Sequence, residues 1–297
     1  MAIDYKIELG KKIKMIRLEK QMTQADLCGD EAELTIRQLA RIENGQAMIS
    51  IPKLAYVAQV FEMPMQDLVD LNQMVLPKEY LVLKNKLIHA HTYGDVERIK
   101  RHEAMFDEIY EKYYDNLPEE EQLSVEILQV RLDTFSSQNP NYAISLFDEY
   151  LHQVLKKSSY SSNDLLLIAV YLFCCAVGLE ENQYFDEFAE KVLLYTDYSD
   201  PEKMFVFELV LLAVLIQIVP EKYLIYTRIL REVIEETNSF IHKPAVYMFE
   251  ARYYHHVEHD RDKAAESYDK AISFAKMLND EILVKNVEME KATDLAT

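Results

Sequence analysis

The chain has 297 residues, a mass of 34.8 kDa and only 5 glycines, which disfavours glycine-rich phosphate loops and hairpin-dense β architectures. A hydrophobic share of 49% with 28% charged residues excludes intrinsic disorder, because such a chain buries enough apolar surface to offset its ordering entropy. The net charge of −19 is uneven: residues 1–60 hold 9 Lys and Arg against 8 Asp and Glu, whereas residues 61–297 hold 23 against 43, an asymmetry that indicates two modules with different partners.

The first 70 residues predict a series of short helices. Thr23 and Asp26 have the spacing of a capping box, in which the side chains at the N-cap and three residues later bond each other's backbone N–H. Thr35 and Gln38 repeat that spacing before a helix that we expect to end at Asn44-Gly45, a good C-terminal stop. We therefore expect several helix starts close together in this segment.

Two stretches in this segment resemble the helix-turn-helix of the Xre and phage-repressor type: TQADL, residues 23–27, and RIENG, residues 41–45. In that motif the second helix crosses the DNA backbone, and the third lies in the major groove with its amino end at the base edges. An ordinary helical bundle with surface arginines is the alternative. The resemblance implies a phosphate contact from one glutamine and base or backbone contacts from the recognition helix; the expected DNA-binding residues are Gln24, Thr35, Arg37, Gln38 and Arg41.

The turn between the second and third helices, residues 29–34, departs from this pattern. Its sequence GDEAEL is acidic and longer than is usual for the motif, which leaves the angle of the recognition helix open. Because the module is also close to neutral, we expect modest affinity for DNA as a monomer and reliance on a dimer that reads two half-sites.

The rest of the chain predicts successive helices with short polar breaks. Residues 165–179 and 204–219 are its two most apolar stretches, and both are too short for a membrane span, so we expect buried core helices. In DKAAESYDKAI the small Ala264, the aromatic Tyr268 and the small Ala271 follow the second helix of a tetratricopeptide repeat. Periodicity alone leaves a helical bundle and a superhelical solenoid both open.

Taken together, the helix-turn-helix and the degenerate repeats resemble the peptide-pheromone receptors of Gram-positive bacteria, the Rgg, PlcR and PrgX group, and within it the ComR type of streptococcal competence regulator. LTIRQLARIENG at 34–45, PKEYLVLKNKLI at 77–88, YEKYYDNLPEEE at 110–121, SSNDLLLIAVYLF at 161–173 and KPAVYMFEARY with DKAAESYDKAISFAKML within 243–278 carry the resemblance. It implies an all-α protein: an Xre-type helix-turn-helix domain, then a degenerate tetratricopeptide-repeat right-handed solenoid. The expected parts are 1–70 for DNA binding, a linker at 71–78, a peptide-binding domain at 79–279 and a capping or dimerisation helix at 280–297.

The function that the resemblance implies is a cytoplasmic quorum-sensing regulator, expected to be an activator. A short hydrophobic imported peptide binds the repeats and releases the DNA-binding domain, and a protein that is monomeric without peptide then binds an inverted repeat as a homodimer. In the unliganded state we expect Glu119 to hold the DNA-binding domain by pairing with Arg37 or Arg41, a contact that we call the clasp. Alternatively, Glu119 is a solvated residue in the first turn of its helix. The expected peptide-binding residues are Thr92, His102, Asn163, Phe173, Glu208 and Tyr247, each of which is otherwise a cap or core residue.

Catalytic motifs are missing from the sequence. It contains no Walker loop, HExxH, GxSxG or paired CxxC, so we expect no enzyme activity and no cofactor. His255 and His259 have the i, i+4 spacing of metal ligands but no evident third ligand, and we expect an exposed polar face rather than a metal site. With three cysteines and no secretory signal, the chain fits a reducing cytosol, without membrane partners. A repeat-built adaptor that contacts proteins instead of DNA remains the alternative function.

Overall fold

The computed structural model describes residues 2–68, 76–89, 91–157, 159–195 and 200–296. These residues are helical and form no β-strand, although one isolated parallel bridge pairs Met48 with Pro118. The chain divides into two compact units: residues 1–91, 97–132 and 145–163, and residues 92–96, 133–144 and 164–297. The helix-turn-helix segment therefore shares a unit with the helices that directly follow it. Of the expected linker at 71–78, residues 71–75 lie outside the described residues.

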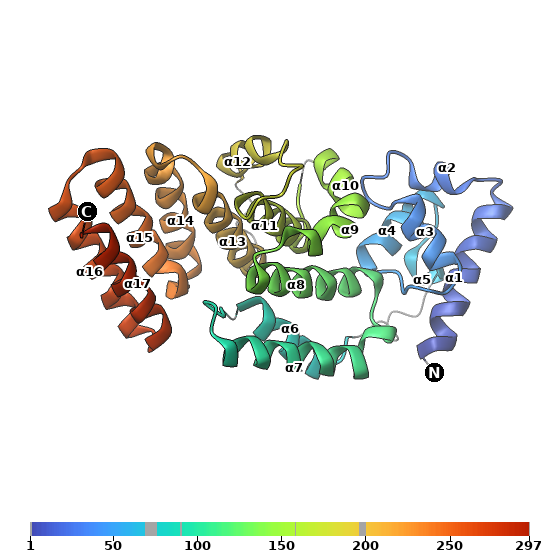
Figure 1. The fold of residues 1–297 in the computed structure, drawn as a ribbon. Coiled ribbons are helices and arrows are strands. Elements are labelled where there is room, and N and C mark those ends of the chain that lie inside the picture. Colours follow the sequence, from blue (N-terminus) through green and yellow to red (C-terminus); the bar gives the residue numbers. More distant parts are fainter. Residues whose placement is uncertain (1, 69–75, 90, 158, 196–199, 297) are drawn as a thin grey trace. The chain divides into compact units, whose positions relative to one another are not determined.

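Five helices form the amino-terminal part of the first unit (Figure 1). They are α1 (Ala2–Glu19), α2 (Gln24–Cys28), α3 (Ile36–Glu43), α4 (Ile51–Val60) and α5 (Met65–Leu68). Both predicted capping boxes are confirmed: the side chain of Thr23 accepts from the Asp26 N–H, and that of Thr35 from the Gln38 N–H. The local sequence thus sets where α2 and α3 begin.

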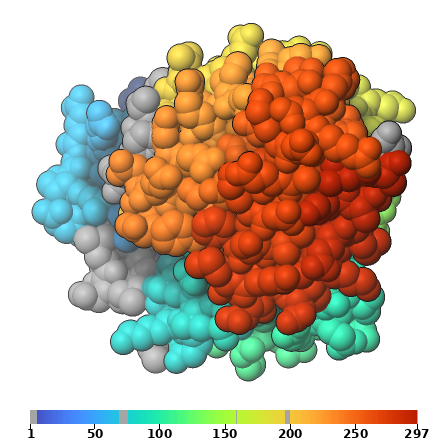
Figure 2. Space-filling view, turned by 90° about the vertical axis from the view of Figure 1, so that its left-hand side faces the viewer, coloured from blue at the N-terminus to red at the C-terminus, as the bar shows by residue number. Residues whose placement is uncertain are grey.

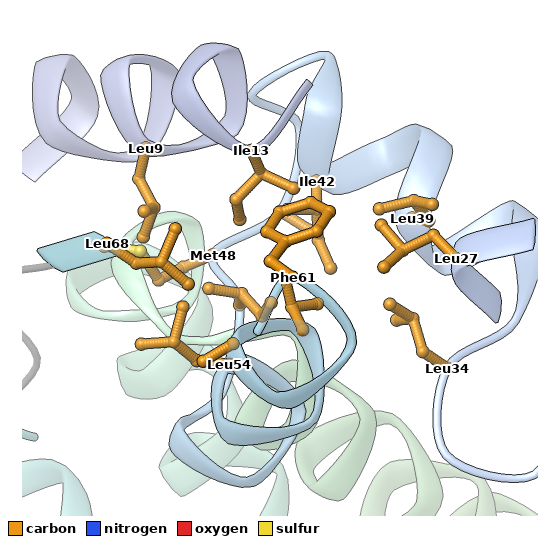
Figure 3. Packing of buried hydrophobic residues seen from close by; sticks show 14 of the residues in the cluster. Leu9, Ile13, Leu27, Leu34, Leu39, Ile42, Met48, Leu54, Phe61 and Leu68 are labelled. Carbon is orange, nitrogen blue, oxygen red and sulfur yellow. The ribbon is translucent and has the colours of Figure 1, made fainter. Parts of the chain in front are cut away.

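One hydrophobic cluster holds these five helices together. Its side chains converge from all of them: Leu9 of α1 points toward Leu68 of α5, and Ile13 of α1 lies beside Ile42 of α3 and Phe61 at the end of α4 (Figure 3). Ile13 and Phe61 are fully buried. Since burying such a side chain contributes about 1.5–3 kcal/mol, this cluster is the main stabilising term of the helix-turn-helix.

The first unit continues through helices that pack beside the helix-turn-helix. They are α6 (Lys78–His89), α7 (Val96–Lys112), α8 (Glu119–Ser137), the short α9 (Ile144–Leu146), a π-helix (Phe147–Leu151) and α10 (His152–Lys156). Helices α6 and α8 are joined by Glu121, whose carboxylate accepts from the Tyr80 hydroxyl at 2.6 Å and from the Lys84 ammonium at 2.8 Å. The residues from 144 to 156 form one run of helix with a wider π-turn in its middle.

The second unit is a row of helices in which neighbours in the chain are neighbours in space. It comprises α11 (Ser162–Ala176, from Asp164 on), α12 (Phe185–Leu193), α13 (Pro201–Gln217), α14 (Tyr223–Thr237), α15 (Lys243–Tyr253), α16 (Arg261–Met277) and α17 (Glu281–Asp294). From α13 onward each helix packs against the next, and α15–α17 form a large part of the surface that faces the viewer in Figure 2. This serial packing is the tetratricopeptide type of fold, and it answers the choice between bundle and solenoid in favour of repeats.

The buried positions of the second unit agree with the sequence pattern. Helices α11 and α13 are almost wholly buried, as predicted for the two apolar stretches. In α16 the repeat-pattern residues Ala264, Tyr268 and Ala271 have no exposed surface, because the small side chains let the paired helix approach the tyrosine closely. Among the described helices, none is long and apolar enough to cross a membrane.

A close approach between α1 and α3 makes Gly10 a sensitive position. A Cβ atom at Gly10 would lie 2.1 Å from the Ile42 carbonyl oxygen. We expect Gly10→Ala to lower the free energy of unfolding by about 1–3 kcal/mol, because the overpacking outweighs the helix propensity that alanine adds. Urea unfolding followed by circular dichroism measures the change. Lys14→Ala, at an exposed position of the same helix, is the control and should stay within about 0.5 kcal/mol of the wild type; a Gly10→Ala protein as stable as this control contradicts the prediction.

Candidate functional site

The recognition helix α3 presents its predicted DNA-reading side chains unequally. Arg37 has a side chain that is 70% exposed, and Arg41 one that is 30% exposed. Gln38 differs from the expectation: it is fully buried, and its amide oxygen accepts the backbone N–H of Thr35. The Gln38 amide nitrogen has no hydrogen-bond partner among the described residues. In this conformation Gln38 closes the capping box and does not reach outward, because the box draws its side chain back along the helix.

Gln24, the expected phosphate contact at the start of α2, is held inside the domain. Its amide nitrogen donates to a carboxylate oxygen of Glu43 at 2.9 Å. The same carboxylate receives both Arg17 donors, at 2.6 and 2.8 Å, and Arg17 is only 6% exposed. The hydrogen bonds that Arg17 donates to Glu43 raise the pKa of Arg17 against the opposing effect of burial. Gln24 and Arg17 together therefore tie α1, α2 and the end of α3 into one rigid domain.

A buried ion cluster joins α4 of the helix-turn-helix to the start of α8. The Lys53 ammonium lies 2.6 Å from a Glu119 oxygen and 3.0 Å from a Glu120 oxygen, and Lys53 and Glu119 are 7% and 1% exposed. Burial lowers the pKa of Lys53, but the two carboxylates outweigh it and the pKa is raised. For Glu120, burial raises the pKa and Lys53 more than compensates, so the pKa is lowered. The charged forms of Lys53 and Glu120 are therefore both favoured in the folded protein.

Backbone and amide contacts reinforce this cluster. The Glu119 N–H donates to the Met48 carbonyl, the one bridge between extended segments that the described residues contain. The side-chain amide of Asn163 donates to the Glu120 carbonyl at 2.7 Å and to its carboxylate at 3.2 Å. Asn163, expected to bind peptide, thus positions the carboxylate that faces Lys53.

The expected pairing of Arg37 with Glu119 is not the one that the structure makes. Arg37 lies 3.2 Å from a carboxylate oxygen of Glu149, in the π-helix, and Arg41 lies 4.0 Å from the other oxygen. Burial by itself lowers the pKa of Arg41. Tyr150 and the carboxylates of Glu119, Glu126 and Glu149 raise it by more, so the pKa of Arg41 is raised overall. Glu119 instead forms its ion pair with Lys53, a cation that is closer to it and more deeply buried. This finding corrects the expected clasp.

The six expected peptide-binding residues fall into both compact units. His102 and Asn163 belong to the first, and Thr92, Phe173, Glu208 and Tyr247 belong to the second. His102 is 7% exposed, and its pKa is lowered by burial and by the nearby Arg131, Arg101 and Arg98, so it is neutral at neutral pH.

In the second unit these residues have internal partners. Thr92 accepts from the Asp95 N–H through its backbone carbonyl at 2.9 Å. Phe173 packs on Phe135 with ring centroids 5.5 Å apart. The carboxylate of Glu208, wholly buried, receives the Thr237 hydroxyl at 3.2 Å and contacts His242. A buried carboxylate needs such donors, so Glu208 is satisfied without a ligand.

Tyr247 offers a more open arrangement. Its ring stacks on Phe274 with the ring centroids 5.5 Å apart, and the Arg231 guanidinium carbon lies over the Tyr247 ring, 5.1 Å from its centroid. Arg231 also pairs with Glu250 at 2.5 Å. Sequence reasoning missed Arg231, Lys53 and Glu149, since a single charged residue on a helix carries no pattern that distinguishes it from a solvated one. Among the described residues, no His, Cys, Asp and Glu side chains group as a metal site requires.

The ion cluster gives a pH prediction. Lys53→Met should lower the free energy of unfolding by about 3–5 kcal/mol, because it leaves a buried carboxylate without its cation. The raised pKa of Lys53 stabilises the fold at pH values below 10.5, and this stabilisation is lost as the pH rises through the folded-state pKa. The lowered pKa of Glu120 stabilises the fold at pH values above 4.5, and this stabilisation is lost as the pH falls through the folded-state pKa. The difference between wild type and Lys53→Met is therefore expected to be constant between about pH 6 and 9 and to shrink in acid.

Urea unfolding at a series of pH values measures this difference. Lys84→Met is the matched control, because it removes a lysine from a more exposed carboxylate, Glu121, that keeps the Tyr80 hydroxyl, and a smaller loss is expected. A Lys53→Met effect that changes sharply between pH 6 and 9, or that is no larger than that of Lys84→Met, contradicts the assignment of a buried, charged cluster.

Comparisons with known proteins extend over almost the whole chain. A family model described as ComR tetratricopeptide matches residues 77–291. The apo form of ComR from S. thermophilus is similar with a TM-score of 0.83 and 33% identity, over 97% of this chain and 99% of that one. The apo form of the competence regulator ComR from Streptococcus vestibularis has a TM-score of 0.81 and 35% identity, over 98% and 99%. A comparison with curated proteins finds no match.

A ligand-bound structure is also similar. ComR from S. thermophilus in complex with DNA and its signalling peptide ComS has a TM-score of 0.69 and 33% identity, over 96% of this chain and 99% of that one. At the same identity, the apo form therefore matches better than the complex, 0.83 against 0.69.

Proposed function

The chain belongs to the ComR family, and on that premise we propose that a short imported peptide, bound by its repeats, releases its helix-turn-helix for binding to promoter DNA. The chain is a peptide-responsive transcription regulator and not an enzyme. We further propose that it is an activator that binds an inverted repeat as a homodimer and is monomeric without peptide. The shared fold of a helix-turn-helix and repeats, and the complex of ComR with DNA and peptide, support this function.

The observation that carries the proposal is the engagement of the basic groups of the DNA-binding domain by carboxylates of the same unit. Arg37 and Arg41 face Glu149, and Lys53 is buried between Glu119 and Glu120. DNA affinity depends on cations that neutralise phosphates, so each cation held by a carboxylate is withheld from DNA. These carboxylates compete with the DNA phosphates for the same cationic side chains.

Two states with different contacts are needed for such regulation. A ligand shifts an equilibrium only as far as it binds one state better than the other. The better match to the apo form than to the complex supports the proposal that the conformation described above is the inhibited state. Peptide binding then has to supply the free energy that separates Lys53 from its carboxylates, and coupling energies between such sites are typically about 1–3 kcal/mol.

For the peptide site we propose the residues expected from the sequence, with Tyr247 as the best supported of them. The stacked rings of Tyr247 and Phe274, with Arg231 beside them, offer an apolar surface next to a cation. Such a surface suits a short hydrophobic peptide with a polar or charged group along its length. Asn163 connects this function to the clasp, because it bonds Glu120 directly.

The decisive experiment is a titration of labelled duplex DNA from the promoter beside the gene with the purified full chain, followed by fluorescence anisotropy at fixed salt. It is run with and without synthetic peptides encoded by the neighbouring short reading frame. Tighter binding with one peptide supports the proposal. Equal binding in both states for every peptide contradicts regulation by release, and no DNA binding in any state favours a repeat-built adaptor.

Removal of one clasp carboxylate gives a sharper prediction. Glu119→Gln should tighten DNA binding without peptide by roughly tenfold, since coupling free energies of about 1–3 kcal/mol correspond to factors of about 5–150. The anisotropy titration measures it. Glu121→Gln, in the same helical turn, is the control, because Glu121 pairs with Lys84 and Tyr80 of α6 and not with the DNA-binding domain. An unchanged affinity in Glu119→Gln, or an equal gain in Glu121→Gln, contradicts the clasp.

A further inference from the structure

The long acidic turn between α2 and α3 is ordered by its own side chains. The carboxylate of Asp30 accepts the Ala32 N–H at 3.0 Å, as in an Asx turn, and the carboxylate of Glu31 accepts the Ile36 N–H at 3.0 Å. Glu31 has a positive φ of 63°, which turns the chain sharply. These contacts use the carboxylates and leave the backbone carbonyls of Asp30 and Ala32 pointing to other partners.

Those carbonyls are bound by the helical run 144–156. The side-chain amide of Gln153 donates to the Ala32 carbonyl at 2.9 Å, and the Lys156 ammonium donates to the Asp30 carbonyl at 3.0 Å. Gln153 is 6% exposed, whereas Lys156 lies at the surface. Both contacts fall within the first compact unit.

Glu149, Gln153 and Lys156 stand at i, i+4 and i+7 of this run, the spacing of one helix face. The side chains along that face are complementary to the groups that they contact. Glu149 places a carboxylate opposite the arginines of α3, and Gln153 and Lys156 place donors opposite two carbonyls of the turn. Glu149 sits in the π-helix 147–151, a wider turn that occurs frequently at functional sites.

We propose that Gln153 and Lys156 are positioning residues that hold the α2–α3 turn by its backbone and thereby set Glu149 against Arg37 and Arg41. The proposal rests on the proposed function and deepens its regulation. It gives the unusual length of the turn a role: an extended loop carries the two carbonyls to the helical run 144–156. Because the acceptors are backbone atoms, the contact depends on the path of the turn and on the two donors, and not on which side chains the turn carries.

The test compares DNA binding with and without peptide for three variants, using the promoter duplex and the peptide found active above. The readout is the Kd without peptide divided by the Kd with peptide. An effect on DNA contact itself changes both Kd values alike and cancels in this ratio. Gln153→Ala with Lys156→Ala should reduce this ratio by about 5–150-fold, as expected for the loss of two hydrogen bonds. Lys156→Arg, which keeps a donor, and His152→Ala, an exposed neighbour, should leave it unchanged.

A second measurement keeps the outcome independent of DNA and peptide. Hydrogen exchange of the backbone amides 31–36 should be faster in the double variant than in the wild type, with the melting temperature lowered by no more than several degrees. Unchanged hydrogen exchange in the double variant overturns the proposal. The proposal is also overturned if the separate variant Glu149→Gln lowers the Kd ratio while the double variant leaves it unchanged. If wild type binds DNA equally with and without peptide, the proposed function fails, and the exchange data alone decide whether the turn is held by these two residues.

Discussion

A lysine ammonium buried between two carboxylates is the interaction on which the first unit depends. Removing Lys53 from water is costly, and only the nearby Glu119 and Glu120 repay it. The bridge from the Glu119 N–H to the Met48 carbonyl and the Asn163 amide on Glu120 fix the geometry that this compensation requires. Because breaking a buried pair costs far more than breaking a surface pair, the helix-turn-helix is held in one defined arrangement with α8.

The charge distribution explains how such a contact is compatible with DNA binding. The first 60 residues are almost neutral, whereas the remainder holds 23 Lys and Arg against 43 Asp and Glu and is strongly acidic. Acidic side chains of α8 and the π-helix meet the few arginines and lysines that a phosphate backbone also seeks. Because both the acidic surface and the phosphate backbone attract the same cations, contact with one excludes contact with the other.

The second unit is organised by different physics. Its helices bury apolar faces against their chain neighbours, and some of its charged groups pair within the unit, such as Arg252 with Glu290 and Glu208 with His242. Repeats of this kind respond to a ligand through small changes between adjacent helices, because each contacts mainly its neighbours. The stacked pair of Tyr247 and Phe274 lies in this row.

The sequence by itself determined the local elements of this protein. The capping boxes at Thr23 and Thr35, the apolar stretches that became α11 and α13, and the small-aromatic-small pattern of α16 are all encoded within a few residues, so they can be read without a structure. The motif resemblance then led to the family. For the site, the same reasoning singled out Arg37, Arg41 and Glu119 but not the ion-pair partners that the structure gives them.

Only the tertiary structure decided which charges meet. Lys53 and Glu119 are 66 residues apart and Glu208 and His242 are 34 apart, and no local pattern records such a pairing. The burial of Gln38 has the same origin: its capping role is local, but tertiary packing decided that its side chain is fully buried. Helix starts depend on neighbouring side chains and are therefore local, whereas ion pairs depend on where the folded chain brings distant helices together.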